Sequence, residues 1–102
     1  MSDFTEKWRL AAKEWLGLQD AADLLTGSKN DVLAEITSRS EGNSHAEKDR
    51  NARCSQEWRD FRTKMTTAES AARRAKFRVQ YAKMEREDHM NAEANKRAEM
   101  RL

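Results

Sequence analysis

The sequence predicts an all-α protein: an antiparallel helical hairpin or coiled coil with a long C-terminal helix, assembled into oligomers. Its 102 residues contain no proline and only three valine or isoleucine residues, so the β-branched segments that a sheet needs are missing. Alanine, the residue with the highest helix propensity, occurs 15 times. Two long segments place apolar residues at alternating steps of three and four, which is the heptad spacing with which helices pair.

The first helical segment is expected at about residues 4–39. Gly27 is expected to end one helix, and Ser28 with Asp31 to start another, so we expect two abutting helices or one kinked helix. The heptad positions of this segment, which we call the first seam, are Phe4, Trp8, Ala11, Trp15, Leu18, Ala22 and Leu25.

A turn region is expected at about residues 40–55, where the apolar pattern is interrupted. Ser44 is followed three residues later by Glu47, which is the spacing of a capping box at a helix N-terminus. The charged residues 45–53 suit a short helix, and Ser55 is the next N-cap.

The last segment, about residues 56–101, contains neither glycine nor proline and is expected to be one long helix. Packing the two seams against each other gives an antiparallel hairpin in a single domain of residues 1–102. Trp8 and Trp15 then lie beside the alanine-rich part of the last segment, where large residues opposite small ones let helices approach closely. The positions of the second seam are Trp58, Phe61, Met65, Ala68, Ala72, Ala75, Val79 and Ala82.

The last segment also carries large side chains on the face opposite its seam. At 100° per residue, this opposite face holds Arg73, Arg74, Phe77, Tyr81 and Met84. A two-helix hairpin buries only one face of each helix, so these residues are expected to be exposed or to contact another subunit. We therefore predict an oligomer interface at Phe77, Tyr81 and Met84.

Positive charge gathers on the same stretch of the chain. Residues 61–86 carry eight Lys or Arg and two Glu, a net charge of +6, although the whole chain carries only +2. Cations interleaved with aromatic rings suit the phosphates and bases of a single strand. The alternatives are interhelical ion pairs and a solvated helix face. The predicted nucleic-acid-binding residues are Arg73, Arg74, Lys76, Phe77, Arg78, Tyr81 and Lys83.

Other residues offer little for chemistry, and we expect no enzyme, no cofactor and no metal site. Cys54 is the only cysteine and has no catalytic partner at a recognisable spacing. His89 lies between Glu85 and Glu93 at helical spacing, which is fewer ligands than a structural metal site uses. We find neither a signal peptide nor a membrane-spanning apolar run, so we expect a cytoplasmic protein without a membrane partner.

Three stretches of the chain resemble small all-helical proteins encoded by tailed phages and prophages, in recombination or replication gene modules. These stretches are EGNSHAEKDRNARCSQEWRDF at 41–61, AESAARRAKFRVQYAKMERE at 68–87 and EANKRAEMRL at 93–102. Such modules include UvsY-like recombination mediators, which oligomerise and bind single-stranded DNA. The resemblance implies a recombinase, an annealing protein or a single-strand-binding protein as partner, and a bacterial host cell as location.

The charge pattern and the resemblance together predict a non-catalytic accessory of DNA recombination. In this hypothesis the cations contact phosphates, while Phe77 and Tyr81 stack on bases or support the oligomer interface. The alternative is a structural or regulatory coiled-coil protein, for example an inhibitor of a host factor. It would bind a protein partner through Phe77, Tyr81 and Met84 and would have no affinity for nucleic acid.

Overall fold

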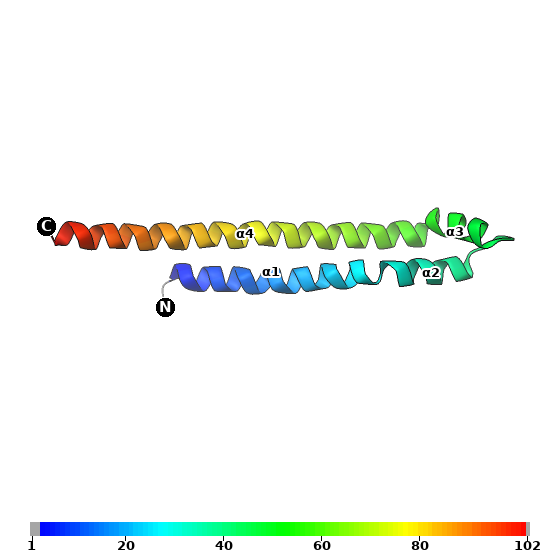
Figure 1. Cartoon of the computed structure of the whole chain (residues 1–102), viewed down its shortest axis with the longest axis horizontal. Coiled ribbons are helices and arrows are strands. Elements are labelled where there is room, and N and C mark those ends of the chain that lie inside the picture. The colour runs from blue at the N-terminus through cyan, green and yellow to red at the C-terminus, as the bar shows by residue number, and fades with distance from the viewer. Residues whose placement is uncertain (1–2, 102) are drawn as a thin grey trace. The chain divides into compact units, whose positions relative to one another are not determined.

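The computed structural model describes residues 3–101, and these residues form four helices without any strand. The helices are α1 (Asp3–Gly27), α2 (Lys29–Arg39), α3 (His45–Arg53) and α4 (Gln56–Met100) (Figure 1). The predicted all-α hairpin with a long C-terminal helix is therefore confirmed.

The chain divides into two compact units. The first unit comprises the described residues of Met1–Leu18 and Ala71–Leu102, and the second comprises Gln19–Ser70. The beginning of α1 and most of α4 thus belong to the first unit, and α2 and α3 belong to the second.

The helix boundaries follow local hydrogen bonding. Ser44 caps α3, because its Oγ accepts from the Glu47 backbone N–H at 3.2 Å, and the Glu47 carboxylate accepts from the Asn43 N–H at 3.1 Å. Ser55 accepts from the Trp58 N–H at 3.2 Å in the same way. Ser28 differs from a capping residue: its backbone is helical and its hydroxyl donates back to a carbonyl in the preceding turn, so α2 begins without a side-chain cap.

The second unit is held by a small apolar core at the turn. Ile36 of α2, Ala52 of α3 and Trp58 of α4 are buried, and the Trp58 and Phe61 rings stack with centroids 5.7 Å apart. These residues bring three helices to one cluster, and Ala52 is the one buried residue among the nine of the charged α3.

Polar pairs show that the helices of this hairpin run antiparallel within the second unit. Thr26 of α1 donates to Glu69 of α4 at 3.2 Å, while Arg39 of α2 donates to Glu57 of α4 at 2.8 Å. The hydrogen bond and charge of Glu57 raise the pKa of Arg39 above its ordinary value. Residue numbers rise along one arm of the hairpin while those of their partners on the other arm fall, which is the antiparallel arrangement.

The first unit pairs the start of α1 with α4 in the same antiparallel sense. Ala72, Ala75 and Ala82 of α4 are buried, and Trp8 and Trp15 of α1 are partly buried. Lys76 lies over the Trp15 ring and Arg86 over the Trp8 ring, so the two tryptophans lie along the alanine-rich part of the second seam, as predicted. Small alanine side chains let the helices approach, and large indole rings opposite them add apolar area that is removed from water.

Candidate nucleic-acid interface

The outward face of α4 in the first unit carries three exposed apolar side chains, which we call the exposed stripe. Phe77 is 66 % exposed, Tyr81 64 % and Met84 60 %. Because Ala75 and Ala82 turn toward α1, residues half a helical turn away from them face outward. The spacing of four and three residues brings the members of the stripe onto adjacent turns.

A shallow groove of about 430 Å³ runs along one edge of the exposed stripe. Phe77 and Tyr81 form its α4 side, together with the stems of charged residues from both helices. Its lining residues are Lys7, Ala11, Phe77, Arg78, Tyr81, Ala82 and Glu85. The stripe is therefore continuous with an apolar depression rather than a set of isolated side chains.

Arg73 is the predicted phosphate-binding residue that the structure leaves most available. It is exposed, lies one turn before Phe77, and makes no ion pair or hydrogen bond with any residue in the range 3–101. The neighbouring Arg74 is also exposed. These two guanidinium groups extend the stripe toward the N-terminal end of α4 with positive charge.

The two predicted lysines lie on the exposed surface and are held only weakly. Lys76 has its ammonium nitrogen 6.0 Å from the Trp15 ring centroid, at the outer limit of a cation–π contact. Lys83 lies 4.0 Å from a Glu87 carboxylate oxygen in the next turn of the same helix. At exposed sites an ion pair of this kind contributes about 0.3–0.5 kcal/mol and a cation–π contact about 0.5–1 kcal/mol, so an anionic ligand could replace either contact.

Arg78 has a partner across the hairpin. Its guanidinium donates to the Glu14 carboxylate at 3.0 Å, and both side chains are about half exposed. At this position the structure therefore favours the interhelical ion pair, one of the alternatives that the sequence left open. Arg78 can contact a phosphate only by exchanging one anionic partner for another.

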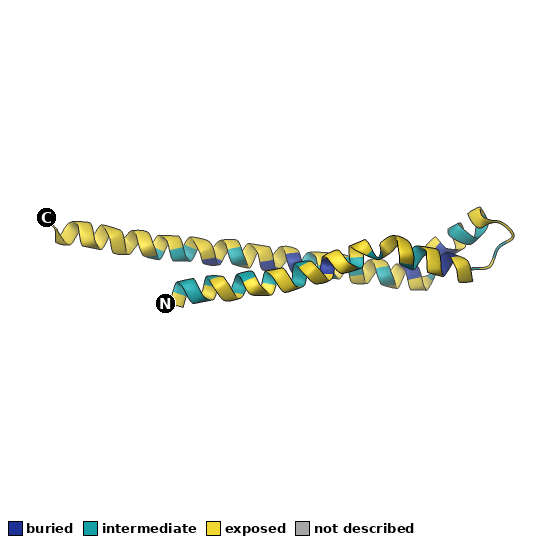
Figure 2. Cartoon of the chain, turned by 60° about the horizontal axis from the view of Figure 1, so that its bottom comes forward, coloured by how far each residue is buried: buried dark blue, intermediate teal, exposed yellow. Residues whose placement is uncertain are grey.

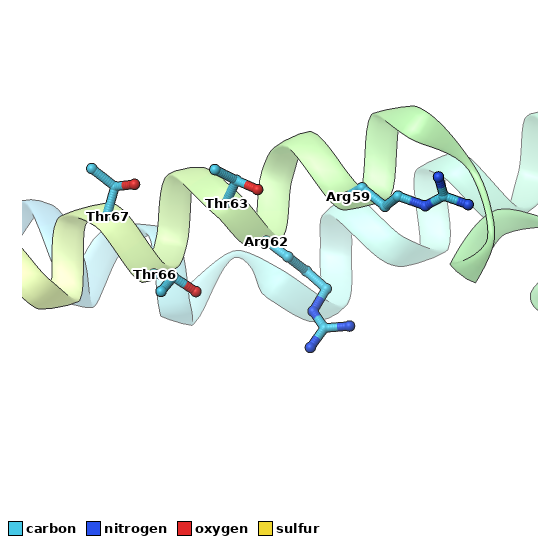
Figure 3. Close-up of a pocket in the computed structure, with 5 residues that line it drawn as sticks. All are labelled: Arg59, Arg62, Thr63, Thr66 and Thr67. Carbon is cyan, nitrogen blue, oxygen red and sulfur yellow. The ribbon is translucent and has the colours of Figure 1, made fainter.

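A second basic surface lies at the start of α4, in the second unit, and was not among the predicted site residues. Arg59, Arg62, Thr63, Thr66 and Thr67 surround it, and all five are exposed (Figure 3). Arg59 donates to the Cys54 carbonyl at 3.0 Å. Figure 3 shows Arg62 and Thr66 on one side of the ribbon and Thr63 and Thr67 on the other, so the polar groups do not converge on one point.

The residues with potential chemistry are placed apart from one another. His89 lies 3.1 Å from Glu93 and against the Phe4 ring, whereas Glu85 pairs with Lys7 at 3.4 Å. Among residues 3–101 no three His, Cys, Asp or Glu side chains gather into a metal site. Within the same range, no helix has an apolar stretch long enough to cross a membrane.

Comparisons with known proteins do not assign this chain to a family. No family model, no curated protein and no solved structure matches it.

Proposed function

We propose that this protein is a non-catalytic DNA-binding accessory that holds single-stranded DNA on the outward face of α4. The observation that carries the proposal is the exposure of Phe77 and Tyr81 on adjacent turns, beside Arg73, which is exposed and has no ion-pair partner in the described part of the chain. Aromatic rings and cations on one surface are the two features that proteins use to bind a single strand without reading its sequence.

The two kinds of contact have different energetic roles. A base stacked on Phe77 or Tyr81 would contribute about 1–3 kcal/mol, whichever base it is. Phosphates held by Arg73, Arg74 and Lys76 would add a favourable contribution from released counterions, which weakens as salt rises. Binding would thus be tolerant of sequence and sensitive to salt.

The resemblance to phage recombination and replication proteins gives this binding a biological setting. A protein that holds an exposed strand in the bacterial cytoplasm would help a recombinase or annealing protein load onto DNA that a single-strand-binding protein covers. Several copies on one strand would raise the local concentration of such a partner without any catalytic step.

Fluorescence anisotropy of a labelled single-stranded oligonucleotide tests the proposal. Phe77→Ala should weaken binding roughly tenfold, since one base loses its stacking partner, and Arg73→Glu should weaken it and reduce its salt dependence. Leu24→Ala and Lys29→Glu are matched controls, because both residues are exposed and belong to the second unit. They should bind like the unaltered protein.

Two results would contradict the proposal. One is the absence of binding at low salt. The other is binding that does not change with salt or that the control variants weaken as much as the site variants do. Either result would favour the alternative, a coiled-coil protein that binds a protein partner through the exposed stripe.

A further inference from the structure

The exposed stripe is flanked by a positive charge at one end and a negative charge at the other, at equal distances along the sequence. Arg73 lies four residues before Phe77, and Asp88 lies four residues after Met84. Both charged residues are exposed, and neither has an ion pair or hydrogen bond among the described residues. One helical face thus reads cation, apolar stripe, anion.

The flanking residues strengthen the same asymmetry. Residues 70–76 contain three cations and no carboxylate, while residues 85–88 contain three carboxylates and one cation. When two copies of this face meet in parallel, like charges oppose each other at both ends. When they meet antiparallel, the basic end of each copy faces the acidic end of the other.

We propose that the exposed stripe binds a second copy of this chain, through an antiparallel and two-fold symmetric contact between their α4 helices. In this arrangement Phe77 packs against the partner subunit's Met84, and Tyr81 lies near the two-fold axis. Arg73 then pairs with the partner subunit's Asp88, and the same pair forms again at the other end. An isologous contact of this kind is closed, so it yields a dimer and not a chain of copies.

The dimer does not require nucleic acid, and its test is independent of the proposed function. The second copy and the single strand bind the same surface, because the exposed stripe that contacts the second copy is also the stripe on which bases would stack. The protein is then a dimer in the absence of DNA. In this dimer the guanidinium of Arg73 pairs with the partner subunit's Asp88, and in the DNA complex it pairs with a phosphate.

A charge-exchange experiment separates the antiparallel contact from every other pairing. In sedimentation equilibrium without nucleic acid, the unaltered protein should dimerise as its concentration rises. Arg73→Glu and Asp88→Arg should each weaken the dimer at least tenfold, since each places like charges opposite each other at both ends. An equimolar mixture of the two variants should recover a heterodimer of near-normal affinity, because both of its end pairs are again of opposite charge.

Met84→Ala and Leu24→Ala form a matched pair of apolar truncations in the same assay. Met84→Ala should weaken the dimer, and Leu24→Ala, at an exposed position of the second unit, should not. A monomer at all concentrations, equal effects of these two truncations, or a mixture of charge variants that stays monomeric would overturn the proposal.

Oxidative cross-linking provides a second measurement that does not depend on the charge variants. In a Cys54→Ser background, Gln80→Cys should form a disulfide-linked dimer, because this position lies next to the two-fold axis. Asn91→Cys should not link to its own copy in the partner subunit, since the antiparallel arrangement carries the two apart. Efficient linkage at Asn91→Cys would indicate a parallel pairing and would also overturn the proposal.

Discussion

The guanidinium of Arg86 lies 5.1 Å from the ring centroid of Trp8, and its Nε donates to the Thr5 hydroxyl at 3.0 Å. Arg86 occupies the seam position that follows Ala82, so the apolar contact between α1 and α4 continues as a cation–π contact. This relationship explains how the first unit extends beyond its last buried alanine. Every residue of α4 from Met90 to Met100 is exposed (Figure 2).

Arg86→Ala should therefore lower the free energy of unfolding by about 1–2 kcal/mol, because Trp8 loses both the cation–π contact and its packing against the aliphatic stem of Arg86. Urea denaturation followed by circular dichroism measures the change. Arg97→Ala is a matched control, since the one ion pair that Arg97 makes within residues 3–101 is with Glu93 of its own helix at 3.8 Å, and it should change stability by less than about 0.5 kcal/mol. Equal effects of the two substitutions would contradict a role for Arg86 in the pairing of α1 with α4.

Trp15 stabilises the first unit by burying apolar area and destabilises it by burying a polar N–H group. Its indole Nε1 is buried and has no hydrogen-bond partner within residues 3–101. Trp15→Phe keeps an aromatic ring and removes the unpaired donor, so we expect stability to stay within about 1 kcal/mol of the unaltered protein. Trp15→Ala should cost about 2–4 kcal/mol, because the facing alanines cannot fill the space. Thermal unfolding of both variants checks this prediction, and a Phe variant as unstable as the Ala variant would refute it.

Two glycines should respond to alanine with opposite signs. Gly17 lies within α1, and a Cβ there would meet nothing within 4 Å, so Gly17→Ala should stabilise the protein by about 1 kcal/mol. Gly42 has φ +152°, and a Cβ would lie 3.0 Å from the Lys48 backbone nitrogen, so Gly42→Ala should cost about 1–3 kcal/mol. Unfolding in urea measures both, and stabilisation by Gly42→Ala would contradict the described turn.

A single strand and a second copy should compete for the exposed stripe. Adding unlabelled single-stranded oligonucleotide should dissociate the dimer and form strand-bound protein, as measured by sedimentation velocity. Because Met84→Ala weakens the dimer, this variant should bind the strand without a preceding dissociation step. In the absence of DNA, raising the protein concentration should increase the fraction of dimer. Simultaneous binding, with the Gln80→Cys cross-linked dimer holding DNA as well as the unlinked protein does, would show that the two surfaces are separate.

The sequence was sufficient to predict the seams, the capping by Ser44 and Ser55, and the outward exposure of Phe77, Tyr81 and Met84. These features depend on helical periodicity and on bonds between residues three or four apart. The pairing of Arg78 with Glu14 could not be derived, because it depends on the register of two helices 64 residues apart in sequence. Nor could the division into two units, since both seams run without interruption across its boundaries.

Ser28 shows the limit of short motifs. Its spacing to Asp31 suggested a cap, yet the backbone at Ser28 stays helical and the hydroxyl bonds to Leu25 instead. Serine can satisfy a carbonyl of the preceding turn as well as cap the next helix, and only the backbone conformation distinguishes the two.

The salt dependence of single-strand binding tests the central claim most directly. The logarithm of the association constant should fall linearly with the logarithm of salt concentration, with a slope of about −2 to −4 if three to five phosphates are neutralised on α4. Arg73→Glu should make the slope shallower by roughly 0.7 or more, and Lys29→Glu should leave it unchanged. A slope near zero, or one that Lys29→Glu alters as much as Arg73→Glu does, would contradict the placement of the strand on the exposed face of α4.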